Sequence, residues 1–387
     1  MTKDSLRVLM ISDVYFPRIN GVSTSIETFR RDLGHHGVRV TLVAPDYPQR
    51  SDAPDIHRVR SRQLPFDPED RLMHWGELQR TTQRLGQHGF DLVHIQTPFS
   101  AHYAGLRAAR HLRVPAVATY HTHFEEYFHH YLPALPRRWL RAAARRVARA
   151  QCNALNAVVV PSQAMRRTLA DYGVTAPMHV LSTGIPIERF QRGDRLRFRA
   201  MQGIPADRRV ALFVGRVAHE KNIGFLLDAV VHLKQRQPAA MLVVAGEGPA
   251  LPSLQQRARA LGLDSHVRFV GYLDRATELP DCYAAADVFV FSSKTETQGL
   301  VLLEAMAAGL PCYALAEMGT RDILEPQRGA VVAKDEPAAF ADGLAHLLDD
   351  RPRLAQLAYE ARRYANEWSA PERARQLAAL YRSIVGR

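Results

Sequence analysis

Short apolar runs rich in valine, isoleucine and leucine alternate along the whole chain with longer segments whose apolar residues recur at helical spacing. The runs are apolar nearly throughout, which is typical of strands in a parallel sheet covered by helices on both faces. Such strands are expected at 7–12, 39–44, 91–95, 116–120, 157–160 and 179–181, and again at 210–214, 241–245, 267–270, 288–291, 312–315 and 330–333. Helical patterns between them include 23–36, 101–112, 225–235 and 338–348. The chain is therefore predicted to be an α/β protein.

The alternation of strands and helices runs about six times and then starts again. The break falls in 182–208, a polar, charged and turn-rich segment that precedes the buried strand VALFVG. A chain of 387 residues is long enough for two or three domains. We predict two doubly wound, Rossmann-like domains joined by one linker, 1–185 and 186–368, and a C-terminal helical segment, 369–387, that packs back toward the first. Two such domains are expected to face a central cleft, with ligands at the carboxyl ends of the strands.

The composition excludes several classes of protein. The three cysteines, Cys152, Cys282 and Cys312, are too few and too scattered for a disulfide framework or a zinc ribbon, and they fit a reducing compartment. No apolar run approaches the roughly 20 residues that cross a bilayer. The apolar stretch 6–12 is too short and too charged for a signal peptide. We therefore expect neither a secreted disulfide scaffold, nor an integral membrane protein, nor a disordered chain.

The net charge of +12 is unevenly distributed along the chain. Residues 1–185 hold 24 Lys and Arg against 15 Asp and Glu, whereas residues 186–387 hold 27 against 24. A basic first half favours an anionic partner, either nucleic acid or an acidic membrane surface. Arginines on solvated faces account for the same numbers, so composition alone leaves the partner open.

Two cations follow the strand that ends at residue 214. Gly215 lets the backbone turn there, and Arg216 and Lys221 stand in the loop that opens toward the predicted cleft. A planar guanidinium and a point-charge ammonium together suit a diphosphate. The alternative is a pair of surface cations in an ordinary strand–helix loop.

The segment SSKTETQGLVLLEAMAAGLP carries two glutamates eight positions apart. Glu296 lies in the loop after the strand at 288–291, and Glu304 lies one to two turns into the helix that starts near Gly299. The free amides of this helix start suit a phosphate. A carboxylate inside an apolar stretch needs partners, and sugar hydroxyls are suitable ones. A nearby cation is the alternative partner for Glu304.

Two further loops carry glycines close to strand ends. Gly246–Pro249 follows the strand at 241–245 but lacks the third glycine of the dinucleotide fingerprint, so a tight turn is favoured over a nicotinamide site. In the first half, Gly21 ends a loop and precedes a helix that Ser23 is expected to cap. That loop is placed to cover the predicted cleft.

Four histidines gather after the fourth strand. His121 ends the strand and is expected to point into the cleft, either to bind a substrate sugar or as a core histidine. His123, His129 and His130 follow, but their spacing does not define the convergent geometry that a metal site needs. No metal is therefore expected.

The segment LPRRWLRAAARRVARA is strongly basic. Arginines recur every fourth residue and so share one helical face: Arg137, Arg141, Arg145 and Arg149. The other sides are expected to be supplied by Trp139, Leu140, Ala143, Val147 and Ala150. Cations beside aromatic residues are typical of a helix in a membrane interface. A solvated helix face is an equal alternative, and no known nucleic-acid-binding motif is visible.

Taken together and in this order, the motifs resemble those of the family-four retaining nucleotide-sugar glycosyltransferases of the GT-B type. The resemblance rests on ISDVYFPRINGVSTS, TYHTHFEEY, FVGRVAHEKN and SSKTETQGLVLLEAMAAGLP, and it extends over essentially the whole chain. It implies a GT-B fold, in which two Rossmann-like domains face a cleft. It also implies hexose transfer from a nucleotide sugar with retention at the anomeric carbon, without a metal or other cofactor.

The resemblance assigns roles to residues of this sequence. Glu296 would contact hydroxyls of the transferred sugar and Glu304 the ribose, while Arg216 and Lys221 would hold the diphosphate and support its departure. His121 would contact the sugar from the first domain. The other implied donor-binding residues are Gly21, Thr297, Gln298, Gly299 and Leu300.

Within the family, HTHFEEYFHHY and ETQGLVLLEAMA look most like enzymes that glycosylate diacylglycerol, which are cytoplasmic proteins bound peripherally to the inner face of the cell membrane. The implied donor is UDP-glucose, with UDP-galactose, UDP-glucuronic acid and GDP-mannose as alternatives. His123 departs from the pattern, because Ser or Asp often stands there. The implied membrane-binding residues are Arg137, Arg138, Arg141, Arg145 and Arg149.

Three alternative functions stay open at this point. One is a transferase that acts on phosphatidylinositol or on a lipid-linked polysaccharide. Another is a nucleotide-sugar epimerase, and the third is a degenerate scaffold that binds anionic membranes without catalysis. A nucleic-acid partner is not expected, and the sequence does not indicate an oligomeric state.

Overall fold

The computed structural model describes residues 5–18, 20–48, 53–64, 67–121 and 137–386. Two compact units emerge from its internal contacts, Met1–Gly184 with Ala370–Arg387 (unit 1) and Ile185–Ser369 (unit 2). The chain therefore passes between the units twice, and the two passages pair with each other. The N–H of Ile185 donates to the carbonyl oxygen of Trp368 at 3.0 Å, and a parallel bridge joins Ile185 to Ser369.

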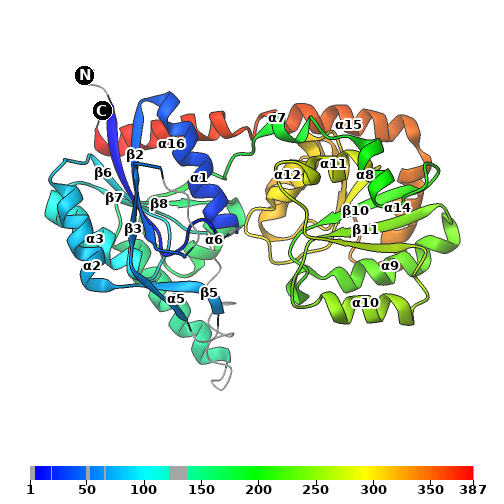
Figure 1. The fold of residues 1–387 in the computed structure, drawn as a ribbon, viewed down its shortest axis with the longest axis horizontal. Coiled ribbons are helices and arrows are strands. Elements are labelled where there is room, and N and C mark those ends of the chain that lie inside the picture. The colour runs from blue at the N-terminus through cyan, green and yellow to red at the C-terminus, as the bar shows by residue number, and fades with distance from the viewer. Residues whose placement is uncertain (1–4, 19, 49–52, 65–66, 122–136, 387) are drawn as a thin grey trace. The chain divides into compact units, whose positions relative to one another are not determined.

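Unit 1 is a parallel sheet with helices on both faces and the strand order β3-β2-β1-β6-β7-β8-β9 (Figure 1). Its strands are β1 (Leu6–Ile11), β2 (Val38–Pro45), β3 (Ile56–Val59), β6 (Leu92–Ile95), β7 (Ala116–Thr119), β8 (Ala157–Val160) and β9 (Met178–Val180). A separate antiparallel pair consists of β4 (Ser61–Leu64) and β5 (Asp67–Met73). The helical segments are α1 (Gly21–Leu33), η1 (Gly34–His36), α2 (Trp75–Gly86), α3 (Ser100–Leu112), α5 (Arg137–Asn153), α6 (Gln163–Asp171) and α16 (Ala370–Val385).

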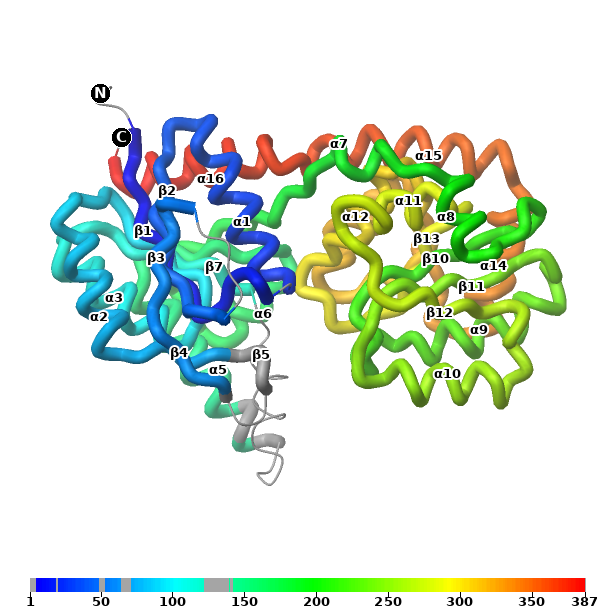
Figure 2. Tube along the Cα trace, in the orientation of Figure 1, coloured from blue at the N-terminus to red at the C-terminus, as the bar shows by residue number. Residues whose placement is uncertain are grey.

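The C-terminal helix α16 is part of the core of unit 1. Its buried Leu377 and Tyr381 pack with Ile26 of α1 against one face of the sheet, and in Figure 2 the blue helix α1 crosses the red helix α16. The hydroxyl of Tyr381 also forms a hydrogen bond of 2.6 Å with the ring of the buried His94. The opposite face is covered by α2, α3, α5 and α6.

Unit 2 repeats this plan with the order β12-β11-β10-β13-β14-β15, again all parallel. The strands are β10 (Arg209–Val214), β11 (Ala240–Ala245), β12 (Val267–Gly271), β13 (Val288–Phe291), β14 (Cys312–Ala314) and β15 (Ala330–Val332). The longer helices are α8 (Arg195–Met201), α9 (Ile223–Arg236), α10 (Leu251–Ala260), α11 (Glu278–Ala285), α12 (Leu300–Ala307), α14 (Pro337–Asp349) and α15 (Arg351–Asn366). Single turns are α7 (Ile187–Phe190), η2 (His219–Lys221), η3 (Met318–Thr320) and α13 (Arg321–Leu324).

The two predicted series of strands agree with the structure to within a residue or two at each end, and both sheets are parallel as expected. The short edge strand β3, the β4–β5 pair and α2 had not been predicted. The segment 182–208 is not a plain linker, because it contains α7 and α8. Each of these helices buries one aromatic side chain, Phe190 or Phe198, in the core of unit 2. The other residues of the segment are mostly polar, so the sequence did not indicate that it packs against the core.

The start of α1 also differs from expectation. The helix begins at Gly21, and the side-chain oxygen of Asn20, rather than that of Ser23, forms the cap by accepting the N–H of Ser23 at 2.8 Å. All three cysteines are free and buried. In the part of the chain that the structure describes, no helix combines the length and the apolar character needed to cross a membrane.

Candidate functional site

The loops after β10 and β13 meet where the strand order of unit 2 reverses, which is the position at which doubly wound sheets bind ligands. Lys221, from the first loop, and Glu296, from the second, form an ion pair with an Nζ–Oε1 distance of 2.5 Å. The loops are joined a second time, because the side-chain amide of Asn222 donates to the carbonyl oxygen of Ser292 (3.2 Å). The hydroxyl of Ser292 in turn donates to the carbonyl oxygen of Asn222 (3.0 Å). The fold thus brings together a predicted diphosphate cation and the predicted sugar-binding carboxylate.

The Lys221–Glu296 pair is partly open to solvent, with 20% of one side chain and 19% of the other exposed. An ammonium carries three donor protons, and one of them goes to Glu296. Two protons are left for an anion. The carboxylate in turn has a second oxygen that can accept from a hydroxyl.

Arg216 is exposed, and within the described residues its guanidinium has no hydrogen-bond or ion-pair partner. The loop that carries it lies directly on the turn Gly246–Pro249, where the N–H of Val217 donates to the carbonyl oxygen of Glu247 at 2.8 Å. A Cβ atom on Gly246 would stand 2.0 Å from the carbonyl oxygen of Gly215. The glycine of this turn therefore permits close backbone packing that holds the Arg216 loop in place.

The loop from Glu296 into α12 is supported from behind by η3. Gly299 has a left-handed φ of 84°, and a Cβ atom there would meet the side chain of Thr320 at 3.0 Å. The N–H of Gly319 donates to the carbonyl oxygen of Glu296 at 2.9 Å, and a Cβ atom on Gly319 would stand 2.1 Å from the carbonyl oxygen of Thr297. Sequence reasoning missed this support. Of the remaining predicted donor-binding residues of unit 2, Thr297 and Gln298 lie in the same loop and Leu300 is the first residue of α12.

Glu304 is buried, with 2% of its surface exposed, and both of its carboxylate oxygens have partners in α11 or the loop before it. Oε1 accepts from Arg275 at 2.5 Å, and Oε2 accepts from the hydroxyl of Tyr283 at 2.9 Å. The carboxylate of Glu304 raises the pKa of Arg275. The cation that the sequence left open as an alternative partner is therefore present, and the ribose contact stays a prediction. Neither Arg275 nor Tyr283 had been identified from the sequence.

At the corresponding reversal of unit 1, between β1 and β6, a buried carboxylate ties two loops together. The backbone N–H of Asp13 donates to the hydroxyl oxygen of Thr97 at 2.6 Å, and that hydroxyl donates to the Asp13 carboxylate at 2.8 Å. The same carboxylate accepts from the N–H of Ala101 at the start of α3 (3.1 Å). Burial raises the pKa of Asp13 to about 6. The predicted residue Gly21 lies further along this chain segment, with open space where a side chain would be.

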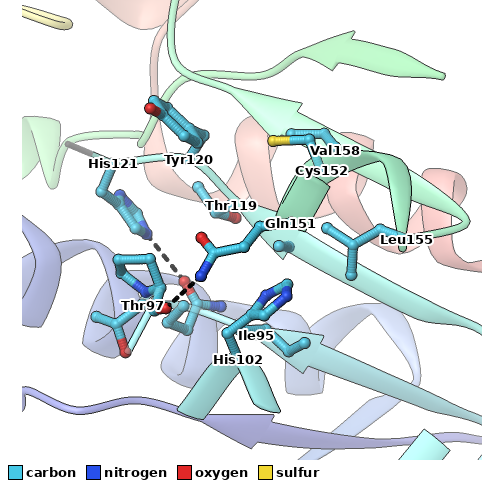
Figure 3. A pocket seen from close by; sticks show the side chains of 13 residues that line it. Ile95, Thr97, His102, Thr119, Tyr120, His121, Gln151, Cys152, Leu155 and Val158 are labelled. Carbon is cyan, nitrogen blue, oxygen red and sulfur yellow. Dashed lines mark hydrogen bonds between the residues drawn. The ribbon is translucent and has the colours of Figure 1, made fainter. Parts of the chain in front are cut away.

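His121 lies at the end of β7, beside a recess of unit 1 (Figure 3). Its Nε2 forms a hydrogen bond of 2.9 Å with Oε1 of Gln96, and burial lowers its pKa to about 4. His123, His129 and His130 lie outside the described residues. Among those described, no three His, Cys, Asp or Glu side chains cluster as metal ligands would, and a reaction without metal stays a prediction.

The basic segment forms the helix α5, which contains Arg137, Arg138, Arg141, Arg145 and Arg149. Arg145 and Arg149 are exposed, and the guanidinium of Arg145 lies over the ring of Tyr172, 5.3 Å from its centroid. Of the residues expected on the other sides of this helix, Trp139 is 65% exposed and Val147 is 37% exposed. The buried stripe consists instead of small residues spaced four apart, Ala144, Ala148 and Cys152. Cations and an exposed tryptophan thus share the solvent side of α5.

Comparison with known proteins covers both units. A family model described as "Glycosyltransferase Family 4" matches residues 19–189, and one described as "Glycosyl transferases group 1" matches residues 194–364. The chain is 31% identical to an alpha-monoglucosyldiacylglycerol synthase of Streptococcus pneumoniae, over 80% of this chain and 71% of that protein. It is 30% identical to a GDP-mannose-dependent alpha-mannosyltransferase of Mycobacterium tuberculosis, over 99% of this chain and 98% of the other.

Solved structures show the same fold at lower identity. The crystal structure of Anabaena Alr3699/HepE in complex with UDP has a TM-score of 0.77 and 19% identity, and the match covers 98% of this chain and 100% of that one. A sucrose-phosphate synthase from Thermosynechococcus elongatus has a TM-score of 0.78 and 21% identity, and the match covers 98% of this chain and 99% of the other. At such identities the likeness concerns the fold.

Proposed function

The chain belongs to the family-four glycosyltransferases of the GT-B type, and on this premise we propose that it transfers a hexose from a nucleotide sugar to a hydroxyl group of a membrane lipid. The observation that carries the proposal is the Lys221–Glu296 pair at the strand-order reversal of unit 2. It joins a cation suited to a diphosphate with a carboxylate suited to sugar hydroxyls. An epimerase or a scaffold without catalysis finds no support in the family matches.

The proposed chemistry is leaving-group stabilisation. As the bond between the anomeric carbon and the diphosphate oxygen breaks, the diphosphate takes the electron pair, and Arg216 with the free protons of Lys221 neutralises the growing charge. The acceptor oxygen bonds to the anomeric carbon on the face from which the diphosphate departs and gives its proton to the departing diphosphate oxygen, so configuration is retained. Glu296 orients the sugar through its hydroxyls, and no metal is needed in this scheme because the two cations replace it.

For the substrates we propose UDP-glucose and diacylglycerol. The alpha-monoglucosyldiacylglycerol synthase at 31% identity supports a glucolipid product, and the second such synthase, from Acholeplasma laidlawii, is 29% identical. The alternative is mannose transfer from GDP-mannose to a phosphatidylinositol-type lipid. It is supported by the mannosyltransferase at 30% identity over 99% of the chain.

A screen of sugar donors against lipid acceptors tests this proposal. The full chain is incubated with UDP-glucose, UDP-galactose, UDP-glucuronic acid or GDP-mannose and with phosphatidylglycerol vesicles that contain diacylglycerol or phosphatidylinositol. We expect mass spectrometry to detect one hexose added to diacylglycerol from UDP-glucose. Boiled protein is the control. Failure of folded protein to glycosylate either lipid from any of the four donors would contradict the proposal.

We further propose that the protein binds the membrane peripherally through the solvent side of α5. An arginine near an anionic surface contributes about 1 kcal/mol, and an exposed tryptophan at the same face suits the interface. The excess of positive charge in the first half of the chain has the right sign for this contact.

Replacing Arg145, Arg146 and Arg149 together by glutamine is expected to weaken binding to phosphatidylglycerol vesicles roughly 100-fold, since three contacts of this kind sum to about 3 kcal/mol. Vesicle co-sedimentation at several salt concentrations measures the effect, and the salt dependence should fall with it. The matched control replaces Arg351, Arg362 and Arg363 of α15 by glutamine; these residues are also exposed, and their replacement changes the net charge by the same amount. Equal losses in the two triple variants would show that net charge, not α5, is responsible.

A further inference from the structure

The recess beside His121 has features that the proposed reaction does not yet use. It lies between α3, α5 and the carboxyl ends of β6 and β7, and it has a volume of about 440 Å³ when the space at its open mouth is included. Its lining includes apolar side chains, among them Ile95, Leu155 and Val158. Polar side chains line it as well, among them His102, Gln151 and His121 (Figure 3).

His102 is the most informative of these residues. Only 3% of its surface is exposed, and within the described residues neither of its ring nitrogens has a hydrogen-bond partner. Burial lowers its pKa to about 4, so at neutral pH the ring carries one N–H donor and one acceptor nitrogen. A ring nitrogen that faces a recess can be satisfied by water, or by a ligand group that takes the place of that water. A hydroxyl group, which both donates and accepts, would satisfy either nitrogen.

Gln151 provides a second polar group at the same place. Its side-chain nitrogen donates to the carbonyl oxygen of Pro98 at 2.8 Å, which fixes the orientation of the amide. Its side-chain oxygen has no partner in the described part of the chain and can accept from a hydroxyl. Gln151 and His102 both line the recess, and Figure 3 labels both side chains.

The recess is also uncharged. No Lys, Arg, Asp or Glu occurs among its described lining residues, and both of its histidines are neutral at pH 7 because burial lowers the pKa of each to about 4. A phosphate group that entered would lose its hydration without gaining a cation, which is costly. An uncharged polyol would lose little free energy on entering, because hydrogen bonds to the recess would replace those that its hydroxyls made with water.

We propose that this recess binds the glycerol hydroxyl of an uncharged diacylglycerol, with His102 and Gln151 as its hydrogen-bond partners, and that it excludes phosphoinositol headgroups. The inference rests on the proposed function, whose acceptor class it narrows. It also gives His121 a place beside the acceptor, since the same recess includes that residue.

The test compares His102→Phe, which removes both ring nitrogens, with His102→Asn, which keeps a donor and an acceptor. The matched control is His111→Phe, on the same helix but exposed. Each protein is assayed with dioctanoylglycerol and with dioctanoyl phosphatidylinositol, and binding of dioctanoylglycerol alone is followed by calorimetry. For His102→Phe we expect the acceptor KM to rise about tenfold, with the KM for the nucleotide sugar and its slow hydrolysis unchanged. His102→Asn should recover part of the loss, and Gln151→Lys should shift selectivity toward phosphatidylinositol.

Two results would overturn the inference: a wild-type acceptor KM in His102→Phe, or a preference of the wild-type protein for phosphatidylinositol. If His102→Phe does not fold, His102→Asn and Gln151→Lys replace it in the test. The measured quantity is then the KM for dioctanoylglycerol relative to the KM for dioctanoyl phosphatidylinositol. Calorimetry separates the two proposals. Binding of dioctanoylglycerol that depends on His102 without any sugar transfer would support the recess and refute the proposed function, whereas transfer with binding unaffected in His102→Phe would do the reverse.

Discussion

Replacing Lys221 by alanine is expected to lower kcat/KM for the nucleotide sugar by roughly 10²- to 10³-fold, the usual effect of removing one group that stabilises charge in a transition state. Lys221 is positioned for this role by its ion pair with Glu296 and by the hydrogen bonds between its neighbour Asn222 and Ser292. The loss should appear in kcat as well as in KM, because charge on the diphosphate grows as the bond breaks. Steady-state kinetics with UDP-glucose or the donor found in the screen measures it.

Lys294→Ala is the matched control. This lysine stands in the loop that contains Glu296, but it is exposed and pairs with Asp335. Its removal is expected to leave kcat/KM within about twofold of the wild type, because an ion pair on the surface contributes little free energy. A similar loss in both variants would mean that the charge of the region, rather than the position of Lys221, matters.

Glu296→Gln separates the two partners of the pair. The amide keeps the shape of the side chain but releases Lys221 from its ion pair, so affinity for UDP is expected to stay the same or increase while kcat falls. A drop in UDP affinity as large as that of Lys221→Ala would contradict a sugar-binding role for Glu296. It would mean that the carboxylate serves only to hold the lysine.

The sequence allowed most of the architecture to be predicted because its signals are local. Strands such as 157–160 and 288–291 are continuous apolar runs, and their bounds agree with β8 and β13. The helices α7 and α8 were missed because each depends on one aromatic anchor, Phe190 or Phe198, within an otherwise polar segment. A contact of this kind is tertiary, and no periodicity reveals it.

The candidate site likewise contains residues that could be predicted from the sequence and residues that could not. Lys221 and Glu296 could be singled out because each lies in the connection after a strand, and parallel strands bring their carboxyl ends to one edge. Asp13, Gly319 and Arg275 could not, because their roles arise from contacts with residues 29 to 88 positions away or from a backbone approach. Glu304 was noticed as a carboxylate in an apolar helix, but its partners depended on how α11 packs against α12.

Arg275→Met is expected to lower the free energy of unfolding of unit 2 by about 3 kcal/mol, the lower end of the cost of leaving one member of a buried ion pair unpaired. Glu304 is 2% exposed and would keep only the hydroxyl of Tyr283 as a partner. Urea unfolding measures the effect, with Arg257→Met as control. Arg257 pairs with Asp228 on the surface, and its loss should cost at most about 1 kcal/mol.

The double variant Arg275→Met, Glu304→Gln identifies the cause. Removing the carboxylate charge together with its cation should restore much of the lost stability, because the cost of the single variant lies in the uncompensated charge and not in the arginine itself. If the double variant is no more stable than Arg275→Met, packing of the arginine side chain is what matters. The same protein then tests the ribose contact, since a stable double variant that still distinguishes UDP from 2′,3′-dideoxy-UDP as the wild type does would show that Glu304 does not bind the ribose.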